Sequence, residues 1–117
     1  MKQYTIILYT RLKRKVFDNA GAAGRVAELA EESMPDGAYL HEYRVFPDSF
    51  AFTVSMMDGL SAEGVSFAVR KATSAKIRAE FAQFRKMPSL WQRKYALSSK
   101  PASEMNAAYT SALSPEP

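Results

Sequence analysis

The chain has 117 residues, of which 47% are apolar and 12% aromatic, a composition that predicts one globular domain and excludes a disordered chain. It contains no cysteine, which excludes disulfides, thiolate zinc sites and cysteine nucleophiles. The net charge is +4, no apolar run approaches the roughly 20 residues of a membrane span, and no signal peptide is evident, so we expect a cytoplasmic protein with an anionic partner.

The first third of the chain predicts a strand followed by a helix. Residues 3–10 (QYTIILYT) are rich in β-branched and aromatic side chains, which favour a strand. Asp18 or Asn19 is suited to cap a helix that continues to about Ser33. Residues 35–37 (PDG) have strong turn chemistry and are expected to end it.

The middle of the chain predicts a β-hairpin. Two strand-like runs, 38–46 and 49–57, are separated only by Pro47 and Asp48. If the residues flanking this turn face each other, alternation gives an apolar face and a polar face, as in a half-exposed antiparallel sheet. The predicted apolar face consists of Tyr39, His41, Tyr43, Val45, Phe50, Phe52, Val54 and Met56, and the polar face of Glu42, Arg44, Ser49, Ala51, Thr53 and Ser55.

The second half predicts a long helix, a strand and a short helix. Asp58 or Ser61 is suited to cap the long helix, and Ser103 the last one. The tail, 114–117, is expected to be disordered. The three predicted elements cover residues 62–85, 90–99 and 104–113.

The resulting element order is β-α-β-β-α-β plus a C-terminal helix. This order predicts an α+β fold, namely a ferredoxin-like split β-α-β sandwich with an antiparallel sheet and its helices on one face. We expect a single domain over residues 1–113. Many unrelated functions share this architecture, so the fold does not decide the function.

The charged residues are segregated along the chain. The segment from Arg70 to Lys94 contains eight basic residues and one acid, Glu80. Acidic residues cluster instead within residues 28–36. A one-sided positive field favours a polyanion such as nucleic acid, although solvated helices also carry lysine and arginine. We predict a phosphate-binding surface formed by Arg11, Lys13, Arg14, Lys15, Arg70, Lys71, Lys76, Arg78, Arg93 and Lys94.

Several local patterns, taken in order, resemble the single-tyrosine HUH transposases, the insertion-sequence-200-like family that includes the REP-associated tyrosine transposases. The first strand is followed by a basic Val-Phe motif, and the hairpin and long helix carry motifs of this family. A Leu-Trp-Gln-x-x-Tyr motif and a C-terminal tyrosine follow. These patterns are residues 4–9 (YTIILY), 14–17 (RKVF), 45–54 (VFPDSFAFTV), 71–77 (KATSAKI), 90–95 (LWQRKY) and Tyr109.

The resemblance implies a dimeric protein of DNA transposition that acts on single-stranded DNA beside a hairpin. In the family, two histidines and a glutamine hold a divalent cation such as magnesium or manganese, and the tyrosine attacks the scissile phosphate. Tyr109 stands at the nucleophile position. Ser49, Ala51 and Leu113 stand where the three ligands are expected. We therefore predict no metal site and no cofactor, with the DNA surface retained and cleavage lost.

Other residues have simpler interpretations. Tyr109 is expected to dock its helix or contact DNA, because a phenol without a metal lacks activation. Glu42, Arg44 and Asp48 are suited to a substitute carboxylate site or, more commonly, to pairing in solvent. We expect Trp91 to belong to the core and not to stack on a base.

Three hypotheses follow for the function. The first is a DNA-binding relic or domesticated transposase, homodimeric and defective in cleavage. The second is an active transposase that uses Tyr109 with displaced metal ligands. The third is an RNA-recognition-like module, because the strand 50–52 (FAF) resembles the aromatic strand of those proteins. Exposure of Phe50 and Phe52 would favour the third hypothesis, and their burial under helices would eliminate it.

Overall fold

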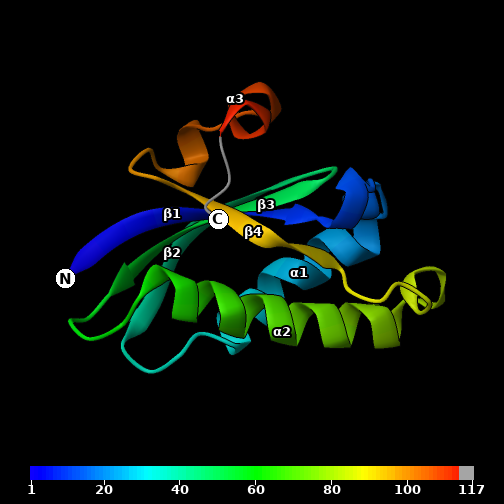
Figure 1. The fold of residues 1–117 in the computed structure, drawn as a ribbon, viewed down its shortest axis with the longest axis horizontal. Coiled ribbons are helices and arrows are strands. Elements are labelled where there is room, and N and C mark those ends of the chain that lie inside the picture. The colour runs from blue at the N-terminus through cyan, green and yellow to red at the C-terminus, as the bar shows by residue number, and fades with distance from the viewer. Residues whose placement is uncertain (114–117) are drawn as a thin grey trace.

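The computed structural model describes residues 1–113, so the predicted tail, 114–117, lies outside the described residues. Strands and helices follow in the predicted order, with four short 3-10 turns between them (Figure 1). The strands are β1 (Lys2–Thr10), β2 (Ala38–Phe46), β3 (Ser49–Met56) and β4 (Trp91–Ser98); the helices are α1 (Ala20–Glu32), α2 (Ala62–Glu80) and α3 (Ala107–Ala112); the turns are η1 (Arg11–Lys13), η2 (Val16–Asp18), η3 (Ala82–Phe84) and η4 (Ala102–Glu104).

The four strands form one antiparallel sheet in the order β2-β3-β1-β4. This order confirms the ferredoxin-like prediction, because each β-α-β unit leaves room for one antiparallel strand between its two parallel strands. The central strands β1 and β3 are therefore paired on both sides, whereas β2 and β4 are the two edges.

Helices α1 and α2 pack on one face of the sheet and enclose the main core (Figure 1). Ile6 and Leu8 of β1 and Phe50, Phe52 and Val54 of β3 are fully buried beneath them. Burying such side chains is the main contribution to stability, at about 1.5–3 kcal/mol for each. Asn19 caps α1 by accepting a hydrogen bond from the backbone of Ala22, as predicted.

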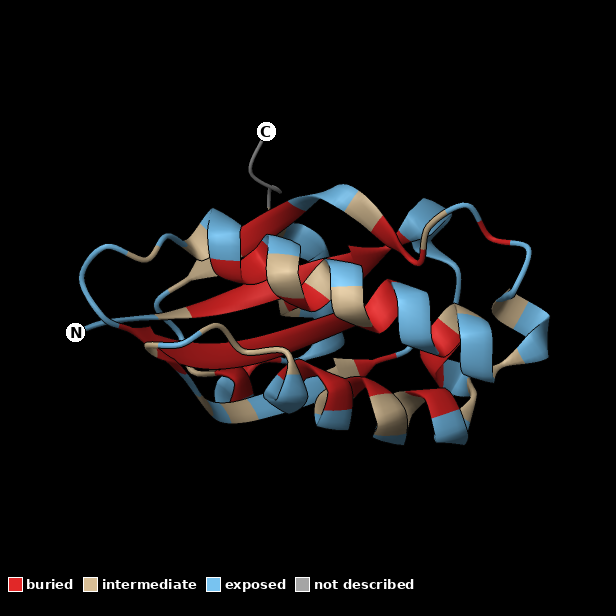
Figure 2. Cartoon of the chain, turned by 90° about the horizontal axis from the view of Figure 1, so that it is seen from below, coloured by how far each residue is buried: buried red, intermediate tan, exposed pale blue. Residues whose placement is uncertain are grey.

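The second face of the sheet is also covered, which differs from the predicted open, polar surface. Every residue of β3 is buried (Figure 2). The chain after β4 crosses this face as η4 and α3, and α3 lies on the side of the sheet opposite α1 and α2 (Figure 1). The contacts form a second apolar cluster of Ile7, Tyr9, Phe46, Ala51, Ala96, Ala102 and Met105.

The predicted face of the N-terminal half of β2 is wrong. The pairing of β2 with β3 shifts between Leu40 and Glu42, so His41 has no cross-strand partner in this ladder. As a result Tyr39 pairs with Ser55 of the second face, and the His41 ring is hydrogen-bonded to the Ser55 hydroxyl. The side chains of Tyr39 and His41 are both exposed, and neither contributes to the core.

Two helix ends also differ from their predictions. Helix α2 stops at Glu80, five residues early, because Phe81 takes an extended conformation and packs against the main core beside Gly21. Helix α3 begins at Ala107, and Asn106 caps it by accepting from the Tyr109 backbone N–H. The predicted cap Ser103 lies inside the 3-10 turn η4 instead.

Candidate nucleic-acid interface

The three positions where the resemblance implies metal ligands lie in apolar surroundings on the second face. Ala51 is fully buried in the second apolar cluster, and Leu113 packs against that cluster. Ser49 is also buried, and its hydroxyl has no hydrogen-bond partner among the residues that the structure describes. One hydroxyl, one methyl group and one leucine do not fit the ligand set of a divalent cation.

Tyr109 is held by its own chain. Its hydroxyl and the Ser98 hydroxyl are 2.8 Å apart and share a hydrogen bond, so α3 is tied to β4. The Lys100 ammonium lies 4.8 Å from the centre of the Tyr109 ring, within range of a cation–π contact. Within residues 1–113, no group of three histidine, cysteine, aspartate or glutamate side chains is close enough together to bind a metal ion.

Two charged residues of β2 hold the C-terminal segment on the sheet. The Glu42 carboxylate accepts a hydrogen bond from the Ser103 backbone N–H at 2.7 Å. The Arg44 guanidinium donates to the backbone carbonyls of Ser103 and Met105 at 3.3 and 3.1 Å. Both residues are candidates for a substitute carboxylate site in the sequence, but in the structure they form hydrogen bonds with the backbone of the covering segment.

Tyr9 makes a buried polar contact with this segment. Its hydroxyl donates a 2.7 Å hydrogen bond to the Thr110 carbonyl, and its side chain is only 6% exposed. Burial, with a smaller contribution from the Asp48 carboxylate, raises the pKa of Tyr9 to about 12.

Tyr9→Phe should lower the free energy of unfolding by about 1–2 kcal/mol at pH 8, because it leaves the Thr110 carbonyl without its donor. The raised pKa means that Tyr9 stabilises the fold below pH 10, and that this contribution is lost as the pH rises toward 12. Urea unfolding of both proteins at pH 8 and pH 11 should therefore show a smaller difference at pH 11. An unchanged difference would contradict this assignment.

A basic groove runs from α2 across the start of β4 to the turn after β1. It consists of three adjoining hollows of about 350, 660 and 240 Å3 that share Pro88. Among the described residues no aspartate or glutamate lines it, so every charged side chain in its lining is cationic. The lining residues are Arg11, Leu12, Arg14, Phe67, Arg70, Lys71, Ser74, Ala75, Arg78, Gln83, Lys86, Met87, Pro88, Ser89, Trp91, Gln92 and Arg93.

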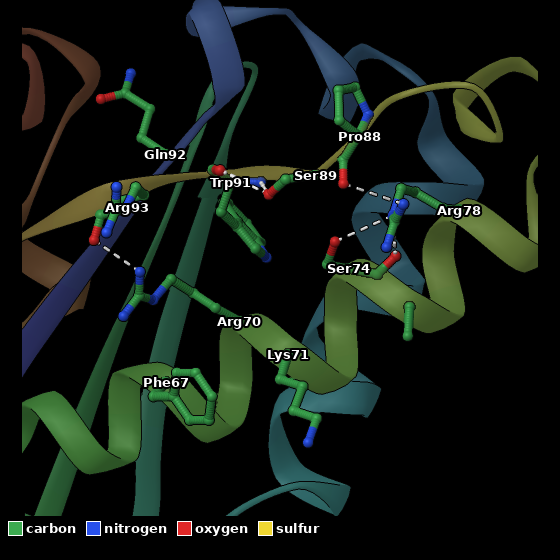
Figure 3. A pocket seen from close by; sticks show the side chains of 11 residues that line it. Phe67, Arg70, Lys71, Ser74, Arg78, Pro88, Ser89, Trp91, Gln92 and Arg93 are labelled. Carbon is green, nitrogen blue, oxygen red and sulfur yellow. Dashed lines mark hydrogen bonds between the residues drawn. The ribbon is translucent and has the colours of Figure 1, made fainter.

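Two arginines of α2 are fixed in the groove by backbone carbonyls. The Arg70 guanidinium donates to the Arg93 carbonyl at 2.7 Å (Figure 3). It also lies over the Tyr95 ring. The Arg78 guanidinium donates to the carbonyls of Met87 and Pro88 at 2.9 and 3.3 Å. Carbonyl oxygens orient a guanidinium without neutralising its charge. Both cations are therefore available for phosphate oxygens in a geometry that needs little reorganisation.

Burial lowers the pKa of Arg70, but arginine stays protonated at physiological pH, so the groove keeps this charge. The only acid of this region, Glu80, forms an ion pair with Arg25 of α1 at 2.8 Å. That hydrogen bond lowers the pKa of Glu80 and keeps its carboxylate paired outside the groove. Glu80 therefore does not neutralise the eight basic residues near it in the sequence.

The structure brings together six of the ten basic residues predicted to bind phosphates, and it adds Lys86. Lys13 and Lys15 are exposed in the turn after β1, and Lys94 is exposed on β4. Lys76 does not line the groove; it lies in a neighbouring hollow between α1 and α2, which shares Phe67, Lys71 and Ala75 with the groove. The six residues that line the groove are Arg11, Arg14, Arg70, Lys71, Arg78 and Arg93.

The aromatic residues of β3 are not available to bases. Phe50 and Phe52 are fully buried and stack on each other, with ring centres 5.4 Å apart. Because base stacking needs solvent-exposed rings, the burial of Phe50 and Phe52 eliminates the RNA-recognition-like arrangement. Trp91 is 3% exposed and its indole N–H donates to the Thr73 hydroxyl at 2.7 Å, so the prediction that it belongs to the core is confirmed.

The exposed aromatic side chain of the groove is one that sequence reasoning missed. Phe67, on α2, is 59% exposed and lies at the edge of the hollow that contains Arg70 and Lys71 (Figure 3). The signal in the sequence is a phenylalanine off the apolar stripe of the long helix, since Val65 and Val69 on either side are buried.

The architecture is that of a transposase fold. The chain superimposes on the crystal structure of a protein from Deinococcus radiodurans R1 described as a candidate transposase, with a TM-score of 0.68. The match covers 85% of this chain and 78% of that one, at 16% sequence identity, so it establishes the fold alone. No curated protein sequence matches the chain.

The family follows from the sequence model. The family described as "Transposase IS200 like" matches residues 2–109, nearly the whole chain. The protein therefore belongs to the IS200-like transposase family, as the motifs in the sequence indicate. No helix within residues 1–113 is both long and apolar enough to span a membrane.

Proposed function

We propose that the protein binds single-stranded or hairpin-bearing DNA through the basic groove and does not carry out metal-dependent strand cleavage. The observation that carries this proposal is the groove itself, which gathers arginines from three separate parts of the chain and is lined by no acid among the described residues. DNA affinity depends mainly on such phosphate contacts.

The proposed loss of cleavage is supported by the substitutions at the ligand positions. Ser49, Ala51 and Leu113 provide no imidazole, carboxylate or amide, and the second apolar cluster fills the space around them. Without a cation, charge developing on the scissile phosphate lacks several kcal/mol of stabilisation. We further propose a homodimer, as the family implies, and a cytoplasmic location, which the absence of cysteine fits.

Binding should be measured by fluorescence anisotropy with labelled hairpin-bearing single-stranded DNA between about 50 and 200 mM salt. The variant R11Q/R93Q should weaken binding by about tenfold or more. It should also reduce the slope of log affinity against log salt by about 1.5, because two phosphate contacts are lost. The matched control K2Q/K100Q removes the same charge at two exposed residues that line none of the three hollows, and it should leave the slope close to that of the wild type.

Equal losses in the two variants would show that net charge, and not the groove, determines the affinity. Cleavage is tested by incubating the protein with the same DNA and either magnesium or manganese, then searching for a covalent adduct on a denaturing gel. We expect none. An adduct that disappears in Tyr109→Phe would establish the active transposase instead.

A further inference from the structure

Leu12 lies at the tip of the turn after β1 in an unfavourable conformation. Leu12 and Lys13 have φ angles of 56° and 54°, and they are the non-glycine residues with positive φ in residues 1–113. The left-handed region is disfavoured for residues with a Cβ atom, especially outside Asn and Asp. Leu12 is nevertheless 73% exposed, so burial of its own side chain does not compensate for this conformation.

The turn that carries Leu12 is anchored firmly at its base. The Arg11 backbone N–H donates to the Leu90 carbonyl at 2.9 Å, and the Arg14 N–H donates to the Arg11 carbonyl at 3.2 Å. The buried Thr10 hydroxyl lies 2.7 Å from the Arg14 carbonyl. These bonds close the turn on itself and join it to the segment that precedes β4, so the leucine projects from a defined base.

The surroundings of Leu12 are cationic and open toward the groove. Leu12 lines the 660 Å3 hollow together with Arg11, Gln92 and Arg93. Exposed basic residues also follow it in the chain, at 13–15. An isolated exposed leucine of a soluble protein needs no explanation, but a strained leucine surrounded by cations beside a phosphate-binding groove does.

We propose that Leu12 is an apolar wedge that stacks on the terminal base pair of a DNA hairpin, at its junction with single-stranded DNA. The proposal rests on the proposed function, since the basic groove must first hold the strand. Apolar side chains flanked by arginine or lysine unstack bases in this way in other DNA-binding proteins. A junction is the favoured place, because the outer face of the terminal base pair stacks only on single-stranded bases. Separating those bases from the pair costs less free energy than separating two base pairs of the stem.

The test uses a hairpin DNA with 2-aminopurine at the junction and, as a second probe, the same base in the middle of the stem. Wild-type protein should raise the fluorescence of the junction probe and leave the stem probe unchanged, since 2-aminopurine brightens when it loses its stacking neighbour. Leu12→Ala should abolish that rise and weaken binding by about threefold to tenfold. The salt slope should remain that of the wild type, because no phosphate contact is removed.

Leu12→Gly distinguishes a loss of base unstacking from a loss of protein stability. Glycine adopts positive φ readily, so this variant should unfold at a higher temperature than the wild type while losing the fluorescence rise to the same degree. Met57→Ala, which shortens another exposed apolar side chain at the far end of β3, should behave as the wild type.

A wild-type rise in both Leu12 variants would overturn the wedge, and so would tight, salt-dependent binding by the wild type with no rise at the junction. In both cases DNA binding by the groove stands. Absence of any salt-dependent binding by the wild type would overturn the proposed function and the wedge together.

Discussion

Ala51→His should lower the free energy of unfolding by about 3 kcal/mol or more, although it introduces a histidine at a position where the resemblance implies a metal ligand. Ala51 is fully buried, and its partners in the neighbouring strands are Ile7 and Arg44. It belongs to the second apolar cluster, which also contains Met105. Overpacking a core costs about 1–3 kcal/mol, and a buried ring nitrogen without a partner costs a similar amount.

Urea unfolding followed by circular dichroism measures this effect. Ala79→His on the exposed surface of α2 is the matched control and should change the stability by about 0.5 kcal/mol or less. A loss of similar size in both variants would show that the second face is not packed as described.

The double variant S49H/A51H tests whether histidines at these two positions can bind a divalent cation. Manganese should not raise its unfolding midpoint, because Leu113 supplies no third ligand and apolar side chains surround the site. A ligand that binds only the folded state raises the stability further as its concentration increases. A midpoint that rises with manganese concentration would therefore show that the two histidines suffice to bind the cation.

Phe50→Ala should destabilise the protein by about 3–5 kcal/mol, the range for a large aromatic side chain lost from a core. Phe50 is fully buried and contacts Phe52 beneath the two long helices. Tyr43→Ala is the natural control, since its ring centre is 6.1 Å from that of Phe50 but the side chain is 46% exposed. We expect a loss of about 1 kcal/mol there.

Denaturant unfolding of the two variants, together with a nucleic-acid binding assay, discriminates the core role from a base-stacking role. A Phe50→Ala protein that retains its stability but loses RNA binding would restore the RNA-recognition-like hypothesis.

The order of the strands and helices was predictable from the sequence because their signals are local. Alternating β-branched residues, the Asn19 cap and the Pro47–Asp48 turn each act over a few residues, so they hold whatever surrounds them. The absence of histidine at residues 49 and 51 is likewise visible in the hairpin motif alone.

Contacts between distant segments decided the rest. The shift of register at His41 and the end of α2 at Glu80 both depend on packing that local patterns do not encode. The covering of the second face depends on Glu42 and Arg44, whose backbone partners lie about sixty residues away along the chain.

The basic groove illustrates the same division. The sequence by itself determined two clusters of cations, one after β1 and one between Arg70 and Lys94. Only the tertiary structure placed Arg11 and Arg93 along one groove, removed Lys76 from it and paired Glu80 with Arg25. Charge can be counted along a chain, but a positive field at one surface depends on which side chains folding brings together and which it pairs with acids.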